Sequence, residues 1–407
     1  MRLIVFTFRN DIRQYNGGST IRIKGYTQYL KEFGVSYKFV APARPHYVHP
    51  DDFVEFRYSR LNLLMIKIHN ILSQKKATKL ISLILKYIIL QISGIKKLEI
   101  LSENTFILSH QNGSIPLFLK LIKGRKFIYD VHGIFSIQKE YLEDASAADK
   151  LIFYLSLAEE KYIYQYADII NITSRRMMRF IKERFNTSAG FALAPEGILE
   201  ENINRNTEKE RVAELALKFG IDPEDKVLFF AGNFKKFGGV HRLVDSFVSL
   251  AGHISNLKLF LIGSGQMEDY VVERIKRNHL EDQFIHIKLI NHSDLWFYQQ
   301  LATLIVCPDI ENPYNELILH IKIFDSIASG KPVVATRFDV LEEVFPPDAD
   351  FIRYAKSSNL NDLNQTIADS IKDLSWFRKA DSKWLSELTY RRLCKNLVDQ
   401  YYRLIQK

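Results

Sequence analysis

Short apolar runs rich in β-branched residues alternate with amphipathic segments along the first half of the chain. The runs have the length and composition of buried strands, and the segments between them repeat apolar residues at helical spacing. The expected strands are 3–8, 38–41, 105–109, 126–129, 169–172 and 191–194, and the expected helices are 21–33, 147–167 and 176–185. This alternation predicts a parallel sheet covered by helices on both faces.

The same alternation begins again after a polar stretch at 194–204. The second set of expected strands is 227–231, 258–262, 284–288, 304–306 and 332–335, with helices at 208–219, 240–251, 268–278, 293–301 and 321–329. The tail, 360–407, repeats apolar residues at helical spacing and is expected to be helical throughout. We therefore expect two doubly wound α/β domains, 1–197 and 198–383, followed by a C-terminal helix at 384–407.

Composition limits the class of protein. A length of 407 residues favours two domains, and 47% hydrophobic with 25% charged residues excludes a disordered chain. There are two cysteines, Cys307 and Cys394, which lie far apart in sequence and provide neither a disulfide framework nor the spacing of a Cys/His metal motif. We therefore expect a reducing, cytoplasmic location and no signal peptide, because the apolar run at the N-terminus is short.

The net charge of +9 is concentrated in one region. No acidic residue occurs between Glu55 and Glu99, and the interval contains nine lysines and arginines. Within it, 61–98 combines lysines with apolar runs that are shorter than the ~20 residues a membrane span needs. This pattern suits the anionic inner face of a membrane, while a pair of buried helices is the alternative. Nucleic acid is not expected as a partner, because no base-stacking motif accompanies the charge.

Several glycine-rich loops follow expected strands. Gly17 and Gly18 precede the first helix, where backbone amides and a helix N-terminus favour an anion, and a plain turn capped by Ser19 is the alternative. In the second half, Asn233, Lys235 and Lys236 lie in a loop that suits a diphosphate, or that is simply a solvated charged loop. Gly263 and Gly265 end the next strand and permit close backbone approach.

Two further motifs carry polar side chains at strand ends. His132, in the sequence Asp130-Val131-His132-Gly133, could donate to a hydroxyl or phosphate oxygen, and a structural turn histidine is the alternative; His110 is a weaker candidate of the same kind. The tract 312–336 leads into a helix with Lys322 and Asp325 on one face. A carboxylate there could accept the hydroxyls of a ribose, whereas an ordinary helix with an exposed Lys–Asp pair is the alternative.

Taken in order, these motifs resemble the GT-B glycosyltransferases, especially the retaining, family-4-like group. The tract 321–334 resembles the donor-site helix of that group, and the Gly17–Gly18 loop, the His132 motif, 194–197, 263–265 and the Trp384-led tail occur in matching order. The resemblance implies two Rossmann-like domains that face each other across a cleft, with the C-terminal helix crossing back to the first domain.

The resemblance also implies roles for individual residues. Asp325 stands where a glutamate usually binds the nucleotide ribose, Gly17 and Gly18 would line the donor diphosphate, and His132 would touch the transferred sugar. The other expected donor-binding residues are Asn233, Gly263, Gly265, Asn315, Glu316, Leu317 and Ile318, and the expected catalytic residues besides His132 are Lys235, Lys236 and Lys322. Leu317 replaces the first family glutamate, His320 a proline, Asn233 an arginine and Gly238 a lysine.

We therefore expect a cytoplasmic glycosyltransferase, peripheral to the membrane, that moves a sugar from a nucleotide-sugar to a glycan or lipid-linked glycan acceptor in surface polysaccharide assembly. No metal or other cofactor is expected. Asp348-Ala349-Asp350 has the spacing of a metal-binding pair, but its composition is that of a surface turn. The alternatives are a nucleotide-sugar 2-epimerase of the same fold and a non-catalytic GT-B scaffold. Retention of anomeric configuration is expected from the resemblance alone.

Overall fold

The computed structural model describes residues 1–7, 17–41, 44–55, 98–99, 101, 105–110, 113–134, 137, 147–203, 209–356 and 359–406. The chain forms two compact units. Unit 1 consists of 1–14, 23–195 and 394–407, and unit 2 consists of 15–22 and 196–393. The chain therefore passes between the units four times: after Gln14, inside the first helix, after Pro195 and inside the last helix.

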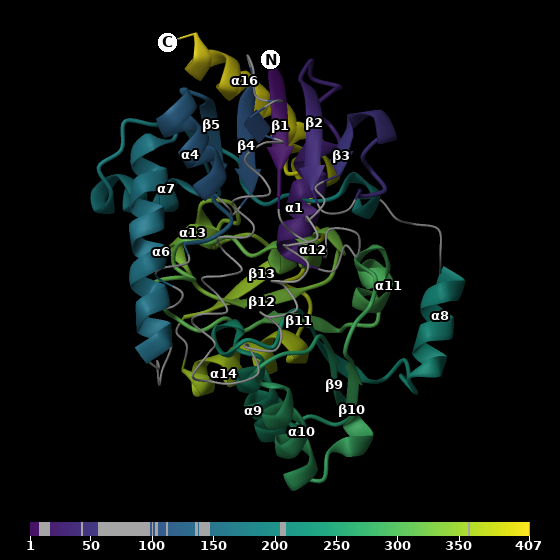
Figure 1. Ribbon diagram of the computed structural model, residues 1–407. Helices are drawn as coiled ribbons and strands as arrows, with labels where there is room; N and C mark the ends of the chain where they lie inside the picture. Colours follow the sequence, from purple (N-terminus) through teal and green to yellow (C-terminus); the bar gives the residue numbers. More distant parts are fainter. Residues whose placement is uncertain are drawn as a thin grey trace. The chain divides into compact units, whose positions relative to one another are not determined.

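Unit 1 contains a parallel sheet in the order β3-β2-β1-β4-β5-β6-β7 (Figure 1). Its strands are β1 (Arg2–Phe6), β2 (Ser36–Ala41), β3 (Phe53–Glu55), β4 (Phe106–His110), β5 (Lys126–Asp130), β6 (Ile169–Ile172) and β7 (Gly190–Leu193). Its helices include α4 (Ser114–Lys123), α6 (Ala147–Tyr166) and α7 (Arg175–Arg184). All residues of β6 are buried, as expected for an inner strand of a sheet with both faces covered. β3 and α4 were not predicted from the sequence.

Local sequence explains where the unit 1 helices begin and end. Ser174 has an extended backbone, and its hydroxyl accepts a hydrogen bond from the amide of Met177, which fixes the start of α7. Gly124 adopts a left-handed conformation with φ of 65° and ends α4, as glycine commonly does after a helix. These ends place the strands that follow in the register of the parallel sheet.

Unit 2 contains a second parallel sheet, in the order β10-β9-β8-β11-β12-β13. Its strands are β8 (Lys226–Ala231), β9 (Leu257–Ile262), β10 (Phe284–Ile287), β11 (Leu304–Cys307), β12 (Val333–Thr336) and β13 (Ile352–Ala355). Its helices are α8 (Lys209–Lys218), α9 (Val240–Ala251), α10 (Glu268–Arg277), α11 (Leu295–Gln299), α12 (Ile321–Ala328), α13 (Asp339–Glu342), α14 (Leu360–Lys372) and α15 (Ser382–Glu387). Buried aromatic residues, among them Phe229, Phe260 and Phe324, fill one face of the sheet.

The C-terminal region differs from the continuous helix predicted over 360–407. It contains α14, then a non-helical stretch, the short α15, and finally α16 (Tyr390–Ile405). Asp373 ends α14 with an extended backbone, and Asp381 begins α15 by accepting a hydrogen bond from the amide of Trp384. Apolar residues keep helical spacing across these breaks, so the spacing alone could not predict where one helix ends and the next begins.

The last part of α16 packs against unit 1. The buried Tyr401 accepts a hydrogen bond from the side-chain amide of Asn171 at 2.6 Å, and Gln400 accepts one from the amide of Leu193 at 2.8 Å. These contacts attach the C-terminal helix to β6 and β7, and Figure 1 shows α16 beside the strands of unit 1. The prediction that the C-terminal helix returns to the N-terminal domain is confirmed.

Within the described residues, no helix has both the length and the apolar character to cross a membrane. The basic, apolar segment 61–98 lies outside the described residues except for Leu98, so its predicted membrane role stays a prediction. The Asp348–Asp350 stretch forms an exposed turn, as predicted.

Candidate active site

The loops at the carboxyl ends of β8 and β9 touch each other in unit 2. Gly263 has a φ of +144°, and a Cβ added to it would lie 1.9 Å from the carbonyl oxygen of Gly232. A Cβ added to Gly265 would lie 2.8 Å from the Oδ1 of Asn233. Packing between the two loops therefore requires glycine at positions 263 and 265. Contact of Gly263 and Gly265 with a donor stays a prediction.

The loop that follows β8 exposes the two lysines predicted to act on the leaving group. Lys235 precedes a short 3₁₀ turn, Lys236–Gly238, and both lysines reach solvent. The Nζ of Lys235 lies 5.1 Å from the centroid of the Phe237 ring, and partial desolvation lowers the pKa of this ammonium. The position of these lysines suits a phosphate contact, because their charge is held close to the carboxyl edge of the sheet.

A buried asparagine connects this loop to the one that follows β11. The side-chain amide of Asn315 donates to the carbonyl oxygens of Phe237 and Ile310, at 2.9 and 2.7 Å. Its Oδ1 lies 3.0 Å from the Nε2 of His320. Asn315 thus acts as a structural bridge between the lysine-bearing loop and the start of α12.

The backbone amides of this loop were predicted to bind the donor diphosphate. Three of them are already used: Asn315 donates to the Oδ1 of Asn312, Glu316 to the carbonyl of Asn312 and Leu317 to the carbonyl of Tyr314. These three amides are not available to a ligand in this conformation. Leu317 and Ile318 have largely buried side chains and pack into the unit.

Lys322 and Asp325 do not form the exposed pair that the helical spacing allowed. The Nζ of Lys322 lies 2.7 Å from the Oδ1 of Asp309, which is only 2% exposed and lies two residues after the end of β11. His320 lies 3.9 Å from the same carboxylate, and burial lowers the pKa of its imidazole. Asp309 therefore holds Lys322 at the start of α12 by a buried ion pair that the sequence did not predict.

Asp325 is buried and forms a hydrogen bond with a different element. Its Oδ2 lies 2.8 Å from the Nε2 of His292, in the turn that precedes α11. Its Oδ1 is buried and has no hydrogen-bond partner among the described residues. A buried carboxylate oxygen without a donor is costly, which makes Oδ1 a candidate acceptor for a ligand hydroxyl.

The glycine pair near the N-terminus lies beside α12. α1 (Gly18–Thr27) begins in unit 2, and a Cβ added to Gly18 would lie 3.0 Å from the Cγ2 of Ile321. Thr20 makes a turn contact here, because its hydroxyl donates to the carbonyl of Gly17 at 2.7 Å. Neither helix has an acidic residue in its first turn. The approach of Gly18 to Ile321 brings the N-termini of the two helices together, and paired helix N-termini favour binding of an anion. We call Gly18, Ile321, Lys322 and Asp325 the α1/α12 junction.

The predicted catalytic histidine lies in unit 1, in a buried cluster of three residues. The Oδ2 of Asp130 is 2.9 Å from the Nδ1 of His110 and 2.6 Å from the Nε2 of His132, and the two ring nitrogens are 3.0 Å apart. The register pairs His110 with Asp130 on neighbouring strands, which explains why they meet. Because a carboxylate only accepts hydrogen bonds, both ring nitrogens can donate to one oxygen and fix both rings.

This cluster also has the ligand types of a transition-metal site. Ligand atoms bonded to one zinc ion at about 2.0–2.1 Å lie about 3.3 Å apart in a tetrahedral site. The three atoms here are closer together than that, at hydrogen-bonding distances, so they would have to separate to hold an ion. The arrangement fits a hydrogen-bonded triad better, and contact of His132 with a sugar stays a prediction.

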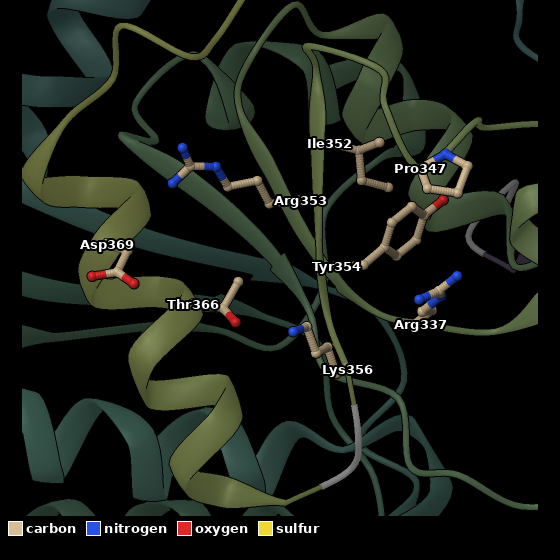
Figure 2. A pocket seen from close by; sticks show the side chains of 8 residues that line it. All are labelled: Arg337, Pro347, Ile352, Arg353, Tyr354, Lys356, Thr366 and Asp369. Carbon is tan, nitrogen blue, oxygen red and sulfur yellow. The ribbon is translucent and has the colours of Figure 1, made fainter.

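A separate pocket of about 310 Å³ lies along β13 (Figure 2). Arg337, Arg353 and Lys356 line it together with Tyr354 and Asp369. Figure 2 shows Arg353 and Tyr354 on opposite sides of the strand. Arg337 pairs with Glu342 at 2.5 Å. None of the predicted site residues lines this pocket.

Both units have the same architecture as solved glycosyltransferase structures. The chain matches sucrose-phosphate synthase from Thermosynechococcus elongatus with a TM-score of 0.75 and 16% identity, covering 100% of this chain and 99% of that one. It matches WaaG, a glycosyltransferase involved in lipopolysaccharide biosynthesis, with a TM-score of 0.66 and 13% identity, covering 100% and 98%. These likenesses show the fold.

The family model described as glycosyl transferases group 1 matches residues 213–380. Residues 213–380 therefore match this glycosyltransferase family, and the chain has the GT-B fold. An uncharacterised glycosyltransferase of Methanocaldococcus jannaschii is 22% identical over 311 residues, which cover 69% of this chain and 75% of that protein. The crystal structure of Anabaena HepE in complex with UDP-glucose matches with a TM-score of 0.63 and 13% identity, covering 100% of this chain and 98% of that one. The comparisons favour neither the epimerase nor the scaffold alternative.

Proposed function

We propose that this GT-B glycosyltransferase binds a nucleotide-sugar in unit 2 and transfers its sugar to a glycan or lipid-linked glycan acceptor. The observation that carries the proposal is the α1/α12 junction. It combines two helix N-termini and the Lys322 ammonium with the buried Oδ1 of Asp325. A nucleotide-sugar has complementary groups, an anionic diphosphate and a ribose diol that can donate to a carboxylate.

The chemistry proposed for this site needs stabilisation of a leaving group. When the bond between the anomeric carbon and the distal phosphate oxygen breaks, its electron pair stays on the diphosphate and the sugar becomes oxocarbenium-like. The oxygen of the acceptor hydroxyl then bonds to the anomeric carbon, and its proton passes to the phosphate oxygen of the leaving nucleoside diphosphate. In this proposal Lys235, Lys236 and Lys322, with the first amides of α12, stabilise the charge on the phosphate without a metal, and the exposure of Lys235 and Lys236 beside the sheet edge supports that role.

The other partners are proposed from chemistry and likeness. The HepE complex supports UDP-glucose as the first donor to test. The apolar, lysine-rich composition of 61–98 supports an acceptor at an anionic membrane surface, as in surface polysaccharide assembly. His132 would contact the transferred sugar, held in position by Asp130. We also propose that the anomeric configuration of the sugar is retained, on the basis of the family resemblance alone.

A thermal-shift panel of UDP-, GDP-, ADP- and CMP-sugars on the full chain tests the proposal. One base is expected to raise the melting temperature, because a ligand at 100 times its Kd adds about 2.7 kcal/mol of stability. Hydrolysis of that donor is then measured for Lys236→Ala, which should reduce turnover roughly 10²–10³-fold, as loss of one donor in such a site does. Lys276→Ala, at an exposed lysine of α10, is the matched control and should not change turnover. If no nucleotide-sugar raises the melting temperature and none is hydrolysed, the protein is a non-catalytic scaffold and the proposal is wrong.

A further inference from the structure

His292 is the second member of a buried pair with the carboxylate that the proposed function assigns to ribose binding. The side chains of His292 and Asp325 are 8% and 4% exposed, and the Nε2 and Oδ2 atoms are 2.8 Å apart. Because an ionised carboxylate only accepts hydrogen bonds, Nε2 carries the hydrogen. The carboxylate therefore has one oxygen held by the protein and one, Oδ1, that no described residue donates to.

His292 is itself held in a defined position. It begins a 3₁₀ turn, and its carbonyl accepts a hydrogen bond from the amide of Leu295 at the start of α11. The next acidic residue of the turn, Asp294, accepts a hydrogen bond from Arg211 at 2.6 Å. The guanidinium of Arg211 lies 3.9 Å from the centroid of the Phe297 ring in α11. The histidine thus approaches Asp325 from an element fixed by its own contacts.

We propose that His292 is a positioning residue that aims Asp325 at the nucleotide and thereby makes the site selective for ribose over deoxyribose. A hydrogen bond to Oδ2 fixes the rotation of the carboxylate, so that Oδ1 has a single direction. A ribose hydroxyl in that direction supplies the donor that the buried oxygen lacks. Without His292 the carboxylate can rotate, and the advantage of a correctly placed hydroxyl is lost.

The size of the effect follows from the charge of the acceptor. A hydrogen bond to a charged group contributes roughly 1.5–3 kcal/mol, which corresponds to about a 10–150-fold difference in affinity. The wild type should therefore bind a nucleoside diphosphate about 10–150-fold more tightly than its 2′-deoxy or its 3′-deoxy analogue. This ratio is the quantity to measure, because a purely structural role for His292 would weaken all ligands equally and leave the ratio unchanged.

The experiment is isothermal titration of the full chain with the best-binding member of UDP, GDP and ADP, and with its 2′-deoxy and 3′-deoxy analogues. His292→Ala is expected to lower the ratio to roughly threefold or less, since the hydrogen bond that orients the acceptor is gone. His292→Gln should retain the ratio, because its amide nitrogen reaches the place of Nε2. His292→Asn is shorter and should lose it, so the Gln and Asn pair carries the test if the alanine variant does not fold.

A matched control comes from another hydrogen bond to an aspartate in the same unit. The hydroxyl of Tyr270 donates to Asp245 at 2.9 Å on α9, outside the α1/α12 junction. Tyr270→Phe removes a donor to a carboxylate, as the His292 variants do, and should leave the ratio at its wild-type value. A change in this control would mean that the ratio reports general loosening of unit 2.

The inference rests on the proposed function, and two outcomes separate their failures. If the wild type does not discriminate, or if Asp325→Ala still discriminates, Asp325 is not the ribose acceptor and the proposed donor site is wrong. If Asp325→Ala abolishes discrimination but His292→Ala preserves it, the donor site stands and His292 does not position the carboxylate.

Discussion

The ion pair between Lys322 and Asp309 makes a prediction that separates stability from catalysis. Asp309 is 2% exposed and the Lys322 side chain is 17% exposed, with 2.7 Å between Nζ and Oδ1. Removing one member of a buried pair leaves an uncompensated charge and costs about 3–5 kcal/mol. Because Lys322 retains some access to solvent and His320 lies 3.9 Å from Asp309, we expect the lower end, about 3 kcal/mol, for Lys322→Ala.

The loss should be visible in thermal unfolding. For a unit of about 200 residues, 1 kcal/mol shifts the melting temperature by roughly 2–4 °C, so Lys322→Ala should melt about 6–12 °C lower than the wild type. In the double variant Lys322→Ala/Asp309→Asn the buried charge is absent, and most of the stability should return. Turnover should stay low in both, by about 10²–10³-fold, because the lysine that stabilises the leaving phosphate is missing from each.

The measurement is a double-mutant cycle of melting temperature and donor hydrolysis, with Asp309→Asn as the other single variant. Equal melting temperatures for Lys322→Ala and the double variant would refute the view that Asp309 needs Lys322. Recovery of turnover in the double variant would refute the catalytic role of Lys322 and leave the pair as a structural contact.

Three further predictions follow from single features. Gly263→Ala should destabilise unit 2 or prevent folding, because its Cβ would lie 1.9 Å from a carbonyl oxygen at a φ of +144°; an unchanged melting temperature would contradict this. Burial lowers the pKa of His320 below its unfolded value, so the stability it contributes is complete above about pH 6.5 and falls as the pH drops below that value. His320→Gln should therefore reduce the loss of melting temperature between pH 7.5 and 5.5, and identical pH profiles would count against it. In flotation with anionic vesicles, reversal of Lys75, Lys76 and Lys79 to Glu should reduce recovery in the lipid fraction, and equal recovery would disprove membrane docking by this segment.

The pattern of apolar residues predicted most of the sheet strands because parallel strands are short, continuous and buried. It predicted β6 with its observed bounds and α9 over Val240–Ala251. It missed β3 and α4, since three residues of an edge strand and a helix of ten residues give little periodic signal. It also joined α14, α15 and α16 into one helix, because the caps at Asp373 and Asp381 are weaker signals than helical spacing.

In the candidate site, the sequence predicted functional residues but not the residues that contact them. Lys322 and Asp325 were identified from the sequence, but their partners, Asp309 and His292, were not. Asp309 could have been found, since it follows β11 at the carboxyl edge where ligands of such sheets bind. His292 could not, because a histidine 33 residues before its partner meets it only through the packing of α11 and α12.

The central claim is that the α1/α12 junction of unit 2 binds the nucleotide of the donor. A crystal structure of the full chain with the nucleoside diphosphate that binds in the panel tests it most directly. The account predicts a ribose hydroxyl within hydrogen-bonding distance of the Oδ1 of Asp325 and the diphosphate at the first turn of α12. A nucleotide bound elsewhere, for example in the pocket along β13, would contradict it.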